Sequence, residues 1–506
     1  MSTPRKAPAR PVLEEKYRIP RASGSVSIDR LVEEVLSCSQ QSPLLRTGTA
    51  RQVDSFLSPE LPTAGVPLQT AIDELIGSAG TYYRKNAHPG MFAYVASPGL
   101  PTDPLAHALT AALNQNVTGY ANAPGATVVE RHIIRWMCKL AGLPDGSDGL
   151  VVSGGSVSNL SALATAVYHT LGPGAREGGI QNGPRPVILA AQSAHFSIQR
   201  AAVLLGIGRS GVEPVGLDST YHMDVGSLKE KLRAISEDPR RAACCVVATA
   251  GTTAMGVVDP LAEIAEVCHQ YGVWLHVDAA YGGAALLSSA LRDRLKGTER
   301  ADSITIDLHK WCYLSFDGSI LLYRDPSAAR ELYAFEAGYA RYGHDQAPES
   351  HSFFDLSPEV SRRNRALQAY LAWRHYGFDL LGRNVQHNAD CAQYLATLVE
   401  AAPDLQPVGK AELSICCFRY LPPLLRGQDD RIDVLNERIV DALSRSGDFL
   451  LSPTLVNGRP VLRVCICSHA TVAQHMDALV AEVRRIGNEL MSPAIPESGR
   501  QWQPSH

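Results

Sequence analysis

Short apolar segments alternate with helical segments through the middle of this chain, and that pattern constrains the fold more than any other feature. The apolar segments are Leu150–Ser153, Val187–Ala191, Cys244–Thr249, Val273–Val277, Ser303–Ile306 and Ile320–Tyr323. Helical periodicity follows several of them, at Asn159–Leu171, Phe196–Leu205 and Leu261–Tyr271. Near-continuous apolar strands that alternate with amphipathic helices are typical of a mostly parallel sheet covered on both faces. The sequence therefore predicts an α/β domain.

Smaller segments flank this α/β domain on both sides. Residues 1–25 are rich in Pro, Arg and Ala without periodicity, which predicts a disordered tail. Residues 26–100 have helical spacing but little core of their own, so we expect them to wrap around a partner subunit. The large domain is predicted at 101–377, a small α+β domain at 378–490 and a second tail at 491–506. The strands expected in the small domain are Ser414–Tyr420, Phe449–Ser452 and Leu462–Cys467.

Composition excludes several classes of function. A net charge of −4, with 45% hydrophobic and 19% charged residues, gives no electrostatic footprint for nucleic acid or a membrane surface. No stretch approaches the roughly 18 continuous apolar residues of a membrane span. The first residues lack the apolar core of a secretory signal, so we expect a cytoplasmic protein. The eleven cysteines are scattered without metal-site or disulfide spacing, which fits a reducing compartment.

The first candidate site follows the strand that begins at Leu150. The segment from Ser153 to Asn159 places glycines, including Gly155, and the hydroxyl of Ser156 at the start of a helix. Glycines permit close backbone approach, and the free N–H groups of a helix start suit a phosphate. The segment is neither a Walker loop nor a dinucleotide fingerprint. A plain turn with a serine cap would give the same pattern.

Three further strand ends carry unusual side chains. His195 follows the strand at 187–191, and its ring suits stacking on a planar heteroaromatic group, although a helix cap is the simpler interpretation. Asp278 directly follows a buried strand and needs a cationic or hydrogen-bonding partner. Lys310 ends another strand, where a Schiff base with a carbonyl cofactor would remove its charge. Because ligands of α/β sheets bind at the carboxyl ends of strands, these parts together predict a site for pyridoxal 5'-phosphate.

The chain also resembles a known family. The motifs are HPGMFAYV, SGGSVSNLSAL, SAHFSIQRAA, VVATAGTTAMGVVDPL, WLHVDAAYGG, ADSITIDLHKW and SRRNRAL, spread over about residues 65 to 485. They are similar to those of the group II pyridoxal-phosphate-dependent amino-acid decarboxylases, which include the aromatic-L-amino-acid decarboxylases. The resemblance implies the aspartate-aminotransferase-like architecture called fold type I. It also implies a homodimer with its active sites at the subunit interface.

The resemblance assigns roles to individual residues. Lys310 would bear the cofactor as a Schiff base, the internal aldimine, while His195 stacks on its ring and Asp278 pairs with the ring nitrogen. Positions on the phosphate side or lining the cofactor are Gly155, Ser156, Thr249, Ala280, Asp307 and His309. The chain departs from the family pattern at Leu308, where proline is usual, at Asp307, where asparagine is common, and at Val157. Asp307 adds negative charge near the phosphate, which would weaken cofactor binding.

The reaction implied by the resemblance is decarboxylation of an L-amino acid to its amine and CO2. In the aromatic decarboxylases that this chain resembles, a loop tyrosine donates a proton to the quinonoid, and it corresponds here to Tyr339. Aldehyde-forming members carry phenylalanine there, so Tyr339 favours simple decarboxylation. Nearby Tyr342 would take this role after a small shift of register, and a surface-loop aromatic is the plain alternative.

The substrate is less constrained than the reaction. HPGMFAYV resembles the aromatic branch of the family, which implies an aromatic amino acid, although Asn86 and Ala87 depart from the animal enzymes. The candidate pocket residues are Tyr94, Val95, Ser97 and Tyr120, with Tyr120 reaching across from the other subunit. An aliphatic or unusual biosynthetic amino acid is the alternative substrate. The alternative activities are aldehyde-forming oxidation, aldol-type cleavage and transamination. The joint retention of four residues argues against a non-catalytic homologue: Lys310, His195, Asp278 and Tyr339.

Overall fold

The computed structural model describes residues 28–41, 43–57, 60–77, 79–334 and 352–491 of the chain. Contacts divide the chain into two compact units, Met1–Cys38 with Arg46–Arg84, and Ser39–Leu45 with Lys85–His506. The smaller unit holds most of α1 (Ile28–Ser39), then α2 (Ala50–Asp54), α3 (Leu68–Gly77) and a 3-10 turn, η2 (Ala79–Tyr82). None of the α3 residues is buried. The expectation that this region covers a partner subunit stays a prediction.

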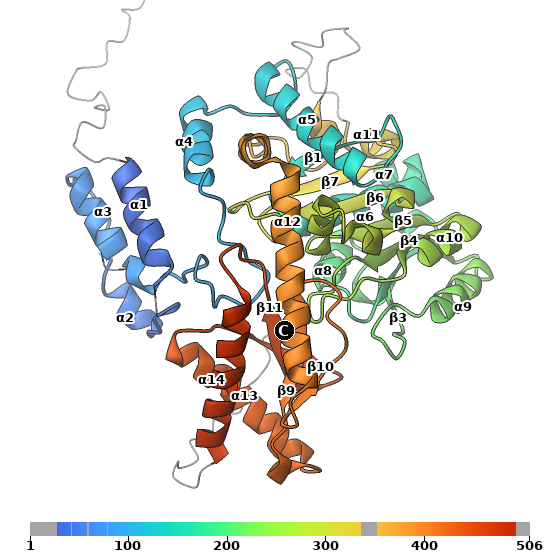
Figure 1. Cartoon of the computed structure of the whole chain (residues 1–506). Helices are drawn as coiled ribbons and strands as arrows, with labels where there is room; N and C mark the ends of the chain where they lie inside the picture. Colours follow the sequence, from blue (N-terminus) through green and yellow to red (C-terminus); the bar gives the residue numbers. More distant parts are fainter. Residues whose placement is uncertain (1–27, 42, 58–59, 78, 335–351, 492–506) are drawn as a thin grey trace, which may run out of the picture. The chain divides into compact units, whose positions relative to one another are not determined.

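The larger unit contains a seven-stranded sheet with the order β1-β7-β6-β5-β4-β2-β3 (Figure 1). Its strands are β1 (Asp148–Val152), β2 (Arg185–Ala191), β3 (Val212–Val215), β4 (Arg241–Thr249), β5 (Trp274–Asp278), β6 (Ser303–Asp307) and β7 (Ser319–Tyr323). β7 runs antiparallel to both of its neighbours, and the other pairings are parallel. The mostly parallel sheet predicted from the sequence is confirmed, with β3 added as an edge strand that the sequence reading missed.

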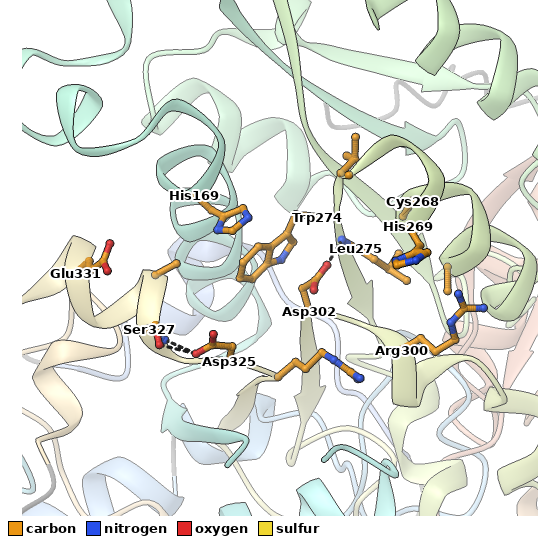
Figure 2. A pocket seen from close by; sticks show the side chains of 15 residues that line it. His169, Cys268, His269, Trp274, Leu275, Arg300, Asp302, Asp325, Ser327 and Glu331 are labelled. Atoms are coloured by element: carbon orange, nitrogen blue, oxygen red, sulfur yellow. Dashed lines mark hydrogen bonds between the residues drawn. The ribbon is translucent and has the colours of Figure 1, made fainter. Parts of the chain in front are cut away.

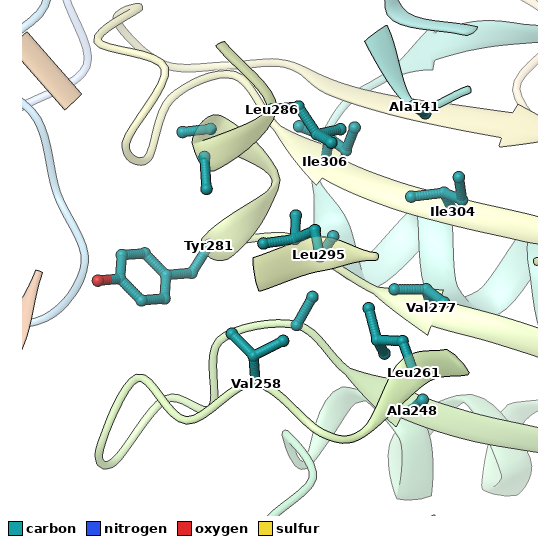
Figure 3. Close-up of a cluster of buried hydrophobic side chains, with 14 of the residues drawn as sticks. Ala141, Ala248, Val258, Leu261, Val277, Tyr281, Leu286, Leu295, Ile304 and Ile306 are labelled. Atoms are coloured by element: carbon teal, nitrogen blue, oxygen red, sulfur yellow. The ribbon is translucent and has the colours of Figure 1, made fainter. Parts of the chain in front are cut away.

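Successive strand residues face opposite sides of this sheet, as the two-residue period of a strand requires. Leu150 and Val152 pack with α6 (Gly155–Leu171) and α8 (Ser197–Leu204). Val151 faces the other way, into a larger cluster with α5 (Pro124–Leu140), α9 (Val225–Ser236) and α10 (Leu261–Tyr271). Figure 3 shows part of that cluster, with Leu286 and Leu295 around Val277, Ile304 and Ile306. Both faces are therefore covered, which explains the near-continuous apolar strands.

A second, antiparallel sheet has the order β10-β11-β9-β8. Its strands are β8 (Leu405–Pro407), β9 (Ile415–Tyr420), β10 (Ser452–Val456) and β11 (Arg459–Cys465), and it packs with α13 (Asp429–Ser446) and α14 (Ala473–Met491). The strand expected at Phe449–Ser452 is misplaced, because β10 only begins at Ser452. Leu450 instead forms an isolated bridge with Met91, far away in the sequence.

One helix belongs to both parts of the larger unit. α12 (Ala366–Glu400) is interrupted at Gly377, whose φ of 72° and ψ of 155° produce a kink at the predicted end of the long helical segment. Figure 1 shows this helix, in orange, running from the large sheet toward the small one. Its buried apolar residues from Ala366 to Ala389 join one apolar cluster that also contains Ile304 of β6, Ile415 of β9 and Cys465 of β11. Those from Cys391 to Val399 belong to the separate cluster under the small sheet. The two sheets therefore share a core.

Within the described ranges, no helix combines the length and the apolar character that crossing a membrane requires. The same ranges contain no group of three or more His, Cys, Asp or Glu side chains placed to hold a metal ion. The cysteine pairs at 244–245 and 416–417 are buried in the core.

Candidate active site

The four segments singled out in the sequence meet at one edge of the seven-stranded sheet. β1, β2, β4, β5 and β6 all point the same way, so their carboxyl ends lie along this edge. Gly155 and Ser156 follow β1, His195 follows β2, Asp278 ends β5, and His309 and Lys310 follow β6. This is the edge at which open α/β sheets bind their ligands.

Lys310 forms an ion pair with Asp307. The Lys310 Nζ lies 2.9 Å from Asp307 Oδ2, and the side chains are 23% and 3% exposed. Burial alone would lower the pKa of Lys310, but the carboxylates of Asp307 and Asp278 outweigh it, so the pKa lies above its usual value. Burial would likewise raise the pKa of Asp307, and Lys310 and His309 hold it below its usual value. The site therefore holds an ammonium beside a carboxylate.

The start of α6 lies directly against Asp307. A Cβ atom at Gly155 would lie 2.8 Å from Asp307 Oδ2, so any larger residue there would displace the carboxylate. Gly154, the residue that precedes the helix, provides no side-chain cap, and Ser156 is exposed. An uncapped helix start leaves N–H groups and the positive end of the helix dipole for an anion. Asp307 consequently contacts both the predicted phosphate side and Lys310.

Asp278 and His195 are joined by side chains that the sequence reading missed. Asn159 Nδ2 lies 2.9 Å from Asp278 Oδ2 and 3.0 Å from the Ser197 hydroxyl. The Ser197 hydroxyl in turn lies 2.8 Å from His195 Nδ1. The backbone N–H of Ala280 donates to Asp278 Oδ1 at 3.1 Å. Asn159 lies in the first turns of α6, within the SGGSVSNLSAL motif. Its place in that motif is the feature of the sequence from which a role at the site could have been predicted.

Several buried polar atoms at this edge have no partner among the described residues. They are the hydroxyls of Ser193 and Thr249 and the Oδ1 atom of Asp307. Buried polar atoms are nearly always hydrogen-bonded, so unpartnered atoms beside Lys310 and Asp278 fit a polar ligand. A primary amine, a buried carboxylate, an imidazole and an uncapped helix start also match the aldehyde, ring nitrogen, ring face and phosphate of pyridoxal phosphate. The residues present therefore fit this cofactor.

The predicted substrate residues are only partly brought to the site. Tyr94 is 58% exposed with a φ of 59°, and its carbonyl accepts a hydrogen bond from Arg463 Nη1 at 2.8 Å. Ser97 is buried and donates to the carbonyl of Leu314, close to Lys310 in sequence, at 3.3 Å. Val95 and Tyr120 are half-buried. In the described chain, no hydrogen bond joins Tyr120 to the Lys310 cluster. Tyr339 and Tyr342 lie outside the described residues.

A cavity of about 710 Å³ lies at the opposite edge of the sheet and includes none of the predicted site residues (Figure 2). It is lined by Trp274, at the start of β5, by Asp302, directly before β6, and by His169. Ligands of α/β sheets bind at the carboxyl edge, which is the other one. Despite its size, this cavity is therefore not the candidate active site.

Replacing Asp307 with asparagine is expected to speed covalent capture of pyridoxal phosphate by the apoprotein at neutral pH. Asp307 is the strongest influence that raises the pKa of Lys310, and only the unprotonated amine reacts with the aldehyde. Each unit by which the pKa falls increases the reactive fraction about tenfold. Stopped-flow absorbance at several pH values measures the capture rate. Asp302→Asn, a carboxylate change at the opposite edge, should not alter it; equal or slower capture by Asp307→Asn would contradict the expectation.

Comparison with known proteins gives a consistent result. The family described as "Pyridoxal-dependent decarboxylase conserved domain" matches residues 65–421. The chain is 30% identical to an aromatic-L-amino-acid decarboxylase of Bacillus atrophaeus over 403 residues, which cover 80% of this chain and 82% of the relative. It is 31% identical to an L-2,4-diaminobutyrate decarboxylase of Rhizobium meliloti (strain 1021) over 480 residues, covering 94% and 93%.

A solved structure extends the agreement to the fold. The crystal structure of mouse CSAD matches with a TM-score of 0.83 at 25% identity, covering 91% of this chain and 97% of that one. The fold type I architecture and the cofactor expected from the sequence are thereby confirmed. The chain belongs to the pyridoxal-dependent decarboxylases, the amino-acid carboxy-lyases that use pyridoxal phosphate.

Proposed function

We propose that the protein removes the α-carboxylate of an L-amino acid, with an aromatic amino acid as the first candidate, and releases the amine and CO2. The observation that carries the proposal is the cluster at the carboxyl edge of the sheet. There, Lys310 is paired with Asp307, and Asp278 is joined to His195 through Asn159 and Ser197. These groups supply an amine, a buried carboxylate and an imidazole in one place.

Each group has a distinct task in this proposal. When bound, pyridoxal phosphate supplies a conjugated ring that accepts the electron pair left at Cα when CO2 departs. Lys310 would hold the cofactor through its amine until substrate binds. Asp278 keeps a proton on the ring nitrogen, because a buried carboxylate favours a cation beside it. His195 would face the ring, and the start of α6 with Ser156 and His309 would hold the phosphate.

The aromatic substrate is supported by the HPGMFAYV segment and by the Bacillus relative. A diamino acid is the second candidate, because the Rhizobium diaminobutyrate decarboxylase is equally similar over a larger share of the chain. The two differ at the far end of the side chain, which is apolar in one and cationic in the other. We propose that selection between these two substrate side chains is made by four residues: Tyr94, Val95, Ser97 and Tyr120.

An amine-release screen tests the proposal. Purified protein with pyridoxal phosphate is mixed with each of the twenty amino acids, hydroxylated aromatic amino acids and L-2,4-diaminobutyrate, and CO2, amine, aldehyde and hydrogen peroxide are measured. Stoichiometric amine and CO2 from an aromatic amino acid are expected. Turnover of diaminobutyrate alone would favour the second candidate. Aldehyde and hydrogen peroxide as main products would overturn the decarboxylase assignment.

Replacing Tyr339 with phenylalanine is expected to divert products from amine toward aldehyde, ammonia and hydrogen peroxide, with O2 as the oxidant. The phenol is proposed to return a proton to the substrate carbon after CO2 leaves, and without it O2 has time to react. Product ratios by chromatography and a peroxidase-coupled assay measure the change. Tyr342→Phe is the matched control on the same segment. If only Tyr342→Phe changes the products, the two tyrosines exchange roles.

We further propose a cytoplasmic homodimer with active sites at the interface. The exposed α3 supports a second copy. So does Tyr120, which within the described residues makes no hydrogen bond to the Lys310 cluster and is therefore available to the site of a partner subunit. Sedimentation of the purified protein should give twice the chain mass of 54.5 kDa. A second test mixes two inactive variants, Lys310→Ala and Tyr120→Ala. Partial recovery of activity is expected, because one of the two sites in the mixed dimer is intact.

A further inference from the structure

We propose that a buried chain of hydrogen bonds from Trp274 to His195 sets the proton positions at the cofactor site, with Asn159 and His276 as its positioning residues. The members, called here the proton-ordering chain, are Trp274, Ser303, His276, Asn159, Ser197 and His195. Asn159, His276 and Ser303 are each no more than 1% exposed. The inference rests on the proposed roles of Asp278 and His195 toward the cofactor.

The contact with Asp278 decides which atom donates in each hydrogen bond of the proton-ordering chain. A carboxylate only accepts hydrogen bonds, so the atom of Asn159 that faces Asp278 Oδ2 at 2.9 Å must be the amide nitrogen. The amide oxygen then faces His276 Nε2 at 3.1 Å. Because that oxygen can only accept, His276 must carry a proton on Nε2. The orientation of one amide therefore decides the tautomer of a histidine on a neighbouring strand.

This tautomer also fixes the direction of the hydrogen bonds that join His276, Ser303 and Trp274. Burial lowers the pKa of His276 to about 4, so the ring is neutral and its Nδ1 carries no proton. Nδ1 accordingly accepts from the Ser303 hydroxyl at 2.8 Å, and β5 and β6 place these two residues side by side in register. The Ser303 oxygen accepts from Trp274 Nε1 at 2.9 Å, and an indole N–H can only donate. Every link agrees in direction.

The same reasoning continues forward to His195. The second amide hydrogen of Asn159 is donated to the Ser197 hydroxyl at 3.0 Å. His195 Nδ1 accepts the backbone N–H of Ser197 at 3.3 Å and lies 2.8 Å from its hydroxyl. Nδ1 is therefore bare, and the neutral imidazole carries its proton on Nε2. Burial, with the nearby Lys310, lowers the pKa of His195 and keeps the ring neutral.

Two properties of the site follow. Asp278 accepts hydrogen bonds from Asn159 and from the Ala280 N–H, and its carboxylate oxygens can accept one more hydrogen, that of a protonated ring nitrogen. His195 presents an N–H rather than a lone pair on its free side. Asn159 supports both at once with its two amide hydrogens. A purely structural network would stabilise the packing of α6 on β5 and β6 without affecting either property.

A matched pair of substitutions at His276 tests the inference. Glutamine can donate to the Asn159 oxygen through its amide, whereas leucine cannot, and both fill a similar volume. We expect His276→Leu and Asn159→Ala to raise the dissociation constant of pyridoxal phosphate about tenfold or more, since they leave buried polar atoms without partners beside Asp278. His276→Gln should remain within a few fold of the unmodified protein. Thr165→Val, a buried polar change on the same helix, serves as the control.

A second readout does not depend on catalysis. ¹⁵N NMR of the histidine rings in the full-length apoprotein distinguishes the two tautomers, and a His195→Gln sample assigns that signal among the 16 histidines. His195 should be protonated on Nε2 in the unmodified protein and should become a tautomer mixture in Asn159→Ala. A bare Nε2 in the unmodified protein, or equal loss of cofactor affinity in both His276 variants, would overturn the inference. An inactive protein that keeps the Nε2 proton would instead count against the proposed function alone.

Discussion

Replacing Asp278 with alanine is expected to lower kcat by at least about 10²-fold and to weaken binding of pyridoxal phosphate. Asp278 is the 5% exposed carboxylate at the end of β5, and it accepts hydrogen bonds from Asn159 and the Ala280 backbone. Without it, nothing at that position stabilises a proton on the ring nitrogen, so the ring accepts electrons less readily. The substitution also leaves the Asn159 amide facing an apolar methyl group.

The measurement is steady-state amine release together with the visible absorbance of the Lys310-bound cofactor. Asp302→Asn is the matched control, since Asp302 is a partly buried carboxylate that receives the Leu275 N–H at 2.7 Å on the opposite edge. It should keep kcat near that of the unmodified enzyme. If Asp278→Ala turned over at more than a tenth of the normal rate with saturating cofactor, Asp278 would have no part in electron withdrawal.

Replacing Arg362 with methionine is expected to destabilise the fold by about 3–5 kcal/mol, because it leaves Glu130 buried without its cation. Both side chains are 0% exposed and form an ion pair. Arg362 also donates to the carbonyls of Val117 and Val151, and Glu130 accepts the Val151 N–H at 2.7 Å. The pair therefore braces β1 just before the turn that leads into α6.

The sign of the pH dependence gives this prediction a second test. Burial already raises the pKa of Glu130 in the unmodified protein, with Arg362 opposing the shift. In Arg362→Met that opposition is lost, so the folded-state pKa rises further above the unfolded value. Protonation then favours the folded state, and the variant should lose less stability at pH 5 than at pH 8. Urea unfolding at both pH values measures this difference.

The double variant Arg362→Met with Glu130→Met supplies the control for the same experiment. It removes both charges, so most of the lost free energy of unfolding should return. Two separate losses that simply add would contradict the coupling between the two side chains.

The parts of the fold that could be predicted are those with a local signal. Buried strands read as apolar runs, and Lys310 and Asp278 stand out because charged residues at the ends of such runs need a purpose. β3 was missed because Glu213 and Pro214 interrupt its apolar character, which an edge strand tolerates. A strand was predicted at Phe449–Ser452, but Phe449 and Leu451 are buried in one cluster with Phe92, and no local pattern reveals so distant a partner.

The missed members of the site are hidden for a related reason. Asn159 and His276 do not stand out in their own sequence segments. Their hydrogen bonds form only because α6 packs against β5 and because β5 pairs in register with β6. From the sequence, the negative charge of Asp307 was expected to weaken binding of the cofactor phosphate. The structure also pairs Asp307 with Lys310, and the sequence alone does not show that the two side chains form an ion pair.

The core shared by the two sheets has a mechanical consequence. Ile304, Ile415 and Cys465 belong to one apolar cluster, and α12 passes through it on both sides of Gly377. A rigid-body rotation of the small sheet away from the large one would expose that cluster to water. The free-energy cost of this exposure is proportional to the apolar surface area exposed. We therefore expect the two sheets to unfold together in one calorimetric transition. Substrate would then enter by the movement of loops rather than by rotation of one lobe.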